Sequence, residues 1–188
     1  METYEAIMTR RSVGKTTDEV PDRTVIEKLI AAAVAAPNHH LTEPWRFIVL
    51  TEDALKEFGD AWAAGEERAG GNPDTAREKA QRAPVILAVI ERPRLTHPKA
   101  VEIEEHHAVG AALQNILLAA HDMGLAAMLR TGPAARMEEV SDYLDLAGEE
   151  FVAGFVYIGY PPDDYDRKAP RKTPISELTE WRGWDGSR

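Results

Sequence analysis

The sequence feature that most constrains the fold is a long apolar run in the middle of the chain. A helical pattern extends over residues 99–123, and its later part, residues 108–120, is apolar on nearly every side of a helix. Gly124 follows where the helix should end, since glycine adopts the left-handed conformation that closes many helices. The run therefore predicts a central helix that packs against several neighbouring elements.

Two prolines, Pro37 and Pro44, enclose a polar stretch that should connect a helix to a strand. Each proline fixes its own φ and disfavours the helical conformation in the residue before it. We therefore expect a helix over residues 23–35 and a buried strand over residues 45–50. The hydrogen-bonding side chains of the stretch are Asn38, His39, His40, Thr42 and Glu43.

This density of donors and acceptors has two explanations. The loop could bind a ligand, since loops often carry the polar groups that do so. It could also be an ordinary solvated connection with two neighbouring histidines. The residues alone leave both explanations open.

The remaining patterns predict a mixed chain of helices and strands that fits one domain over residues 1–188. We expect helices over residues 3–11, 53–68, 75–82 and 134–144, a turn over 70–73, and strands over 84–90, 125–129 and 151–160. Residues 161–188 carry several prolines and little periodicity, which predicts an extended C-terminal tail. Large apolar side chains at Ile175, Leu178, Trp181 and Trp184 predict that this tail docks on its own chain or on a partner.

Composition excludes several classes of protein. The formal net charge of −10 argues against nucleic-acid binding, because no basic run is present to offset the repulsion of phosphates. The absence of cysteine excludes disulfides, thiolate nucleophiles and cysteine-ligated metals. The acidic N-terminus does not resemble a signal peptide, and no apolar run is long enough to span a membrane. We expect a cytoplasmic protein.

Two arginines and a serine, Arg10, Arg11 and Ser12, form a cluster near the N-terminus. The positive charges could simply complement the dipole at the C-terminal end of the first helix. They could also bind an oxyanion, because arginine pairs bidentately with phosphates and carboxylates. Lys15 is close enough in sequence to add a further charge.

A metal site is the main rival to an oxyanion site. His39, His40, Glu102, His106 and His107 could supply ligands for zinc, iron or manganese. The spacing is unfavourable, since adjacent helical residues point about 100° apart and the chain has no H-E-x-x-H motif. We therefore expect no metal, and we assign no catalytic acid, base or nucleophile.

Four segments of the chain resemble the nitroreductase family in their sequence, their order and their spacing. The resemblance extends over almost the whole length of the chain. The four segments are Arg10-Arg11-Ser12; the run Ala36-Pro37-Asn38-His39-His40-Leu41-Thr42-Glu43-Pro44-Trp45-Arg46-Phe47; Ala111-Ala112-Leu113-Gln114-Asn115-Ile116-Leu117-Leu118-Ala119-Ala120 with Gly124-Leu125; and Ile158-Gly159-Tyr160-Pro161 with the basic tail.

The resemblance implies an α+β fold with a central, mostly antiparallel sheet flanked by helices, assembled as an intertwined homodimer. It implies one FMN at each of two interface sites, reduced by NADH or NADPH, which then reduces a nitroaromatic, quinone or similar acceptor in a ping-pong reaction. A flavin-binding carrier, sensor or flavin-processing relative without reductase turnover is the alternative.

The resemblance also implies a role for individual residues. Arg10 and Ser12 would hold the FMN phosphate and ribityl chain, with Arg11 beside them and Arg171 completing the phosphate site. The remaining FMN contacts would come from Asn38, His39 and Leu41 of the other subunit and from Leu129, Arg130 and Thr131 along the isoalloxazine edge.

The chain departs from the family pattern at two positions. Larger members carry a basic residue two positions after the serine, where this chain has Gly14, followed by Lys15. Which side chain faces the N1–O2 edge of the flavin is therefore open. Some small members carry tryptophan where this chain has Leu129, which would leave the pocket above the flavin wider.

Overall fold

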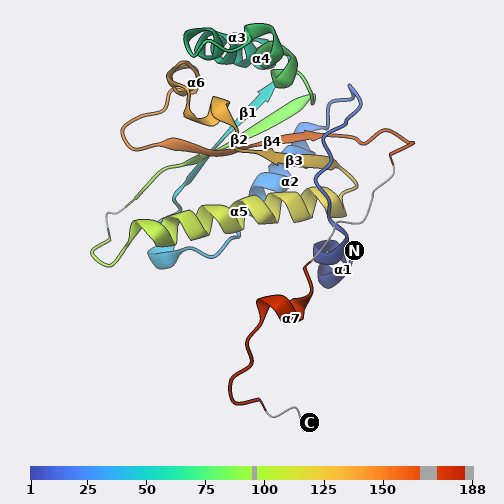
Figure 1. The fold of residues 1–188 in the computed structure, drawn as a ribbon, viewed down its shortest axis with the longest axis vertical. Helices are drawn as coiled ribbons and strands as arrows, with labels where there is room; N and C mark the ends of the chain where they lie inside the picture. The colour runs from blue at the N-terminus through green and yellow to red at the C-terminus, as the bar shows by residue number, and fades with distance from the viewer. Residues whose placement is uncertain (95–96, 166–172, 185–188) are drawn as a thin grey trace.

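An antiparallel sheet forms the middle layer of the protein in the computed structural model, which describes residues 1–94, 97–165 and 173–184. Its strands are β1 (Trp45–Thr51), β2 (Val85–Glu91), β3 (Ala126–Arg130) and β4 (Phe151–Gly159), in the order β1-β2-β4-β3. Every neighbouring pair is antiparallel, and helices cover both faces of the sheet (Figure 1). The predicted α+β fold is confirmed.

The central strand β2 shows why helices cover both faces. All seven of its residues are buried, so it has apolar side chains pointing both ways. Val85, Leu87 and Val89 belong to the core cluster on one face, and Ile86 and Ile90 belong to the cluster on the other. Burial on both faces explains why its sequence is a continuous apolar run and does not alternate.

One face of the sheet packs against the central helix α5 (Glu102–Asp122) and against α2 (Arg23–Val34), as Figure 1 shows. The Asn115 side chain of α5 donates a 3.0 Å hydrogen bond to the Ala32 carbonyl of α2. Gly124 closes α5 with a φ of +77°, where a side chain would be strained. The predicted central helix and its glycine end are confirmed.

The other face packs against α3 (Asp53–Arg68), α4 (Pro73–Ala80), a 3-10 turn η2 (Pro133–Arg136) and α6 (Glu138–Tyr143). The prediction of one helix over residues 134–144 was wrong, because Met137 is extended and separates η2 from α6. A Cβ built at Gly65 would lie only 2.7 Å from the Met137 sulfur. The Met137 side chain therefore fills the space that the missing side chain of Gly65 leaves on α3. Packing against α3 thus overrides the local helical tendency.

Helix α4 begins two residues earlier than predicted. Asn72 caps it by accepting hydrogen bonds from the Asp74 and Thr75 amides, at 2.9 and 3.3 Å. Pro73 occupies the first helical position, where its missing N–H costs nothing. The residues that predicted a turn are therefore the start signal of the helix.

The N-terminal helix α1 (Thr3–Thr9) lies against the C-terminal end of α5 (Figure 1). Thr9 Oγ1 and His121 Nε2 are 2.9 Å apart. After α1 the chain runs along the outer edge of β3, where the Val13 amide donates to the Ala127 carbonyl at 3.0 Å.

At the other end of the chain, α7 (Ile175–Leu178) projects away from the sheet (Figure 1). The apolar side chains that were predicted to dock are mostly exposed in the single chain: Ile175 by 76%, Leu178 by 74%, and Trp181 and Trp184 by 66% each.

Candidate functional site

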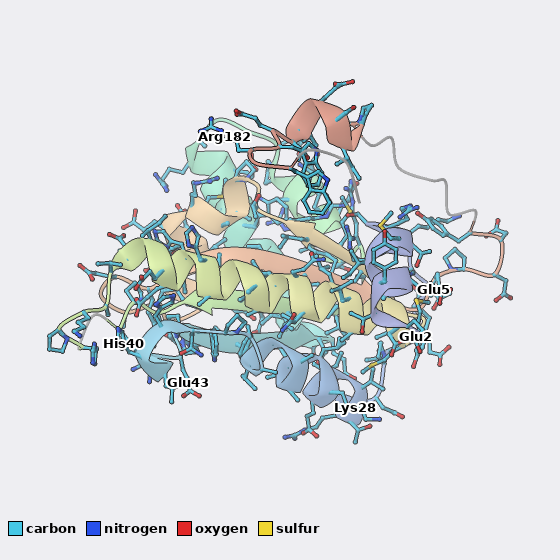
Figure 2. All side chains as sticks on the ribbon, turned by 90° about the horizontal axis from the view of Figure 1, so that it is seen from below. Glu2, Glu5, Lys28, His40, Glu43 and Arg182 are labelled. Carbon is cyan, nitrogen blue, oxygen red and sulfur yellow. The ribbon has the colours of Figure 1, made fainter. Side chains whose placement is uncertain are left out.

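The predicted site residues fall into two groups, one in the arginine cluster and on β3, the other in the turn that precedes β1. The 3-10 turn η1 (His39–Leu41) lies near the start of α5, where His39 Nδ1 is 3.4 Å from Glu104 Oε1. The arginine cluster follows α1, which contacts the other end of α5 through His121. Figure 2 shows His40 and Glu43 beside one end of α5, and Glu2 and Glu5 beside the other. At about 1.5 Å per residue, Glu104 and His121 are separated by about 25 Å along the helix axis.

A cavity of about 310 Å³ lies at the end of β3, which belongs to the first group. Leu129, Arg130 and Thr131, which the resemblance assigns to the isoalloxazine edge, line this cavity. Trp62 of α3 and Lys79 of α4 also line it, and no sequence pattern pointed to either residue. Lys79 Nζ lies 5.6 Å from the centre of the Trp62 ring, and only the packing of α3 against α4 brings the two together.

Arg130 and Leu129 point to opposite faces of the sheet, because neighbouring residues alternate along a strand. Leu129 packs toward α5 and fills the space above Gly154, where a Cβ would lie 2.5 Å from Leu129 Cδ1. The Arg130 guanidinium lies on the other face, 5.1 Å from the centre of the Tyr157 ring. Its Nε is buried and has no hydrogen-bond partner among the residues described.

Tyr157 forms an uncharged surface beneath this guanidinium. Burial raises the pKa of Tyr157 to about 12, and the nearby charge of Arg130 only partly opposes that shift. The phenol therefore stays neutral at physiological pH, and the positive charge of Arg130 is not cancelled from this side.

The arginine cluster contains two different environments. Arg10 Nη1 is buried and makes no hydrogen bond to any part of the chain that the structure describes. Arg11 Nη1 donates to the carbonyls of Met8 and Arg10, at 3.1 and 2.7 Å, and so caps the end of α1. Ser12 is exposed. The segment that follows the cluster is joined to β3 by the hydrogen bond from the Val13 amide to the Ala127 carbonyl.

The second group is a loop with unusual backbone conformations. His40, Leu41 and Glu43 have φ values of 56°, 52° and 47°, which are costly for residues with side chains. The Asn38 side chain helps to hold the loop by accepting a 3.0 Å hydrogen bond from the Glu43 amide. The His40 ring stacks on His97 with centroids 3.8 Å apart, so His40 braces the loop within its own chain.

Two other side chains of this loop project outward. Leu41 is 82% exposed and the His39 side chain is 64% exposed. In the single chain neither lines the pocket at the end of β3. Arg171, predicted to complete the phosphate site, lies outside the described residues.

The histidines and carboxylates that suggested a metal site make protein contacts. His106 Nδ1 hydrogen-bonds the buried Glu91 carboxylate, and His106 Nε2 lies 3.7 Å from Glu102. Burial raises the pKa of Glu91, and the hydrogen bond from His106 opposes the shift. Across the described ranges, no three histidine or carboxylate side chains are grouped so that they could hold a metal ion. In those same ranges, no helix is long and apolar enough to cross a membrane.

Comparison with known proteins shows which sequences this chain is similar to. The sequence profile of the nitroreductase family matches residues 7–160. The chain is 26% identical over 164 residues to "Putative NAD(P)H nitroreductase YdjA" of Escherichia coli, covering 86% of this chain and 89% of that protein. It is 28% identical over 181 residues to the similarly named YfhC of Bacillus subtilis, covering 92% and 90%.

Solved structures agree with the sequence relatives. A nitroreductase-like family protein from Bacillus cereus superposes with a TM-score of 0.84 at 25% identity, over 97% of both chains. A "putative nitroreductase in complex with FMN" from Desulfovibrio desulfuricans gives a TM-score of 0.77 at 25% identity, again over 97% of both chains. The family resemblance is confirmed, and this chain belongs to the nitroreductase family.

Proposed function

We propose that the protein is an FMN-dependent oxidoreductase that uses NADH or NADPH to reduce a small acceptor such as a nitroaromatic or a quinone. Three buried guanidinium nitrogens lack hydrogen-bond partners in the described chain, and two of them, Arg10 Nη1 and Arg130 Nε, carry the proposal because they lie on neighbouring segments. They lie on segments that the Val13–Ala127 hydrogen bond joins. Buried donors of this kind are costly unless a ligand accepts from them.

FMN fits these donors because it has an anionic phosphate and a planar ring with carbonyl oxygens. Arg10 and Ser12 would hold the phosphate and ribityl chain, with Arg11 nearby and Arg171 from the tail as a further cation. Leu129, Arg130 and Thr131 would lie along the ring. Bound FMN would supply the hydride-transfer chemistry, and the protein would supply binding and orientation.

The homodimer is part of the proposal because, within one chain, the η1 residues that should contact FMN do not line the β3 pocket. The η1 loop and the arginine cluster lie beside opposite ends of α5, which are about 25 Å apart along the helix axis. Asn38, His39 and Leu41 of a second copy would supply the missing half, which explains why His39 and Leu41 are exposed in the single chain. The exposed apolar tail supports the same assembly, since a partner would cover it.

Reductant and acceptor would then react one after the other at the same flavin. NADH and NADPH are both kept as candidate reductants, and a cytoplasmic location would give access to either.

The absorbance spectrum of the purified protein tests the proposal directly. We expect a yellow protein that holds one FMN per chain and oxidises NADH or NADPH when menadione or a nitroaromatic is supplied. A colourless protein that takes up no FMN would overturn the proposal. Flavin binding without NAD(P)H oxidation would instead support a carrier, sensor or flavin-processing role.

A further inference from the structure

Gly14 and the Arg130 guanidinium are neighbours in the structure, although the two residues are far apart in the sequence. A Cβ built at Gly14 would lie 3.7 Å from Arg130 Nη2 and 2.8 Å from Met128 Sδ. The Arg130 guanidinium therefore lies beside the backbone at position 14, in the space that a longer side chain there would enter. Position 14 is also where the chain lacks the basic residue of larger nitroreductases.

The charge of Arg130 is available for a ligand. Other arginines, such as Arg23 and Arg77, pair their Nε atoms with carboxylates at 2.8 and 2.7 Å. Arg130 instead stacks over the neutral Tyr157 ring and leaves its buried Nε without a hydrogen-bond partner in the described residues. In an acidic chain, a cation kept apart from carboxylates at the wall of a cavity indicates an anionic or electron-rich partner.

We propose that Arg130 supplies to the N1–O2 edge of bound FMN the positive charge that a basic side chain at position 14 would otherwise supply. This inference rests on the proposed function, since it assigns a role toward FMN. Reduction adds negative charge to that edge of the ring, so a fixed cation there favours the reduced cofactor. The guanidinium is suited to the role because it remains protonated at any physiological pH.

Lys79 is the competing cation, because it lines the same cavity from α4. Its ammonium lies over the Trp62 ring at the end of a flexible side chain. Arg130 differs in having a buried donor and in lying next to Gly14. The two assignments predict different results when each cation is removed.

The test measures the midpoint potential of bound FMN, its dissociation constant and the melting temperature of each variant. We expect Arg130→Gln to weaken binding of reduced FMN relative to oxidised FMN about tenfold, which is a fall in potential of about 30 mV for a two-electron couple. Arg130→Lys, which keeps the charge, should retain most of the wild-type potential. Arg23→Gln is the matched control, since it removes an exposed arginine of α2 and should leave the potential unchanged.

A charge swap makes the test specific to the pair. Gly14→Lys combined with Arg130→Ala should restore most of the potential, because the vacated space accepts the new side chain once Met128 turns aside. The proposal is overturned if Lys79→Gln lowers the potential and Arg130→Gln does not, or if Arg130→Lys and the swap both behave like Arg130→Gln. Failure of the wild-type protein to bind FMN would refute the proposed function itself, and that outcome is seen before any variant is made.

Discussion

Arg10 and Arg11 are neighbours in the sequence, but their side chains have different environments in the folded chain. Sequence reasoning left open an oxyanion site or a helix end, and in the structure Arg11 caps the helix while Arg10 Nη1 is buried without a hydrogen-bond partner in the described chain. Which arginine takes which role depends on Arg10, whose ψ of 137° ends α1 two residues earlier than predicted. That angle is set by the docking of the following segment on β3, which no local pattern encodes.

This difference leads to a prediction for the two arginines. Arg10→Ala should weaken FMN binding by about 1.5–3 kcal/mol, the range for a lost hydrogen bond to a charged group. Arg11→Ala is the matched control, and it should lower the melting temperature more than the FMN affinity, because its guanidinium caps α1. Fluorescence titration of the apoprotein with FMN measures both affinities. Equal FMN affinity in Arg10→Ala and the wild type would exclude Arg10 from the phosphate site.

At the scale of elements, most helices and strands could be predicted from periodicity and from proline and glycine positions. The limits of α3 match the prediction, and those of α5 and β2 differ by only a few residues. The failures occur where tertiary packing decides, as at Met137. The pocket wall formed by Trp62 and Lys79 could not be predicted either, because it exists only where α3 packs against α4.

A buried contact between β2 and α5 gives a prediction at this scale. Burial raises the pKa of Glu91 above its ordinary 4.5, with the charges of Glu105 and Glu102 adding to the shift and His106 opposing it. Folding therefore favours the protonated carboxyl, and this contribution to stability is lost as the pH rises through the folded-state pKa.

Glu91→Gln removes the titration but keeps an oxygen that can accept from His106. Relative to the wild type, the variant should become more stable as the pH is raised above the ordinary carboxyl pKa of 4.5, because the wild-type carboxyl then ionises at a cost to the folded state. Urea denaturation at several pH values measures the difference. Glu19→Gln is the control, since that side chain is exposed and takes no part in the Glu91–His106 contact. A stability difference for Glu91→Gln that does not vary with pH would contradict the assignment.

At the scale of the whole molecule, the separation of the two site halves makes a prediction about assembly. Consider a mixed dimer in which one chain carries Arg10→Ala and the other carries His39→Ala. If each site takes Arg10 from one chain and His39 from the other, one site carries both changes and the other carries neither. We therefore expect half of the FMN sites to bind with wild-type affinity.

The mixed dimer can be isolated with two different affinity tags and titrated with FMN. If both residues served the same site within one chain, every site would carry one change and none would bind as the wild type does. Dimers of each single variant provide the reference affinities.

If the FMN site is divided between two chains, as proposed, the length of α5 also links cofactor content to protein concentration. A site divided between two chains exists only while those chains are associated, so dilution below the dimer dissociation constant should release FMN. The linkage is reciprocal, because a ligand that binds only the assembled form must strengthen assembly by the same free energy. A cell that makes little of this protein, or little flavin, would therefore contain separate colourless chains, and either component could restore the other.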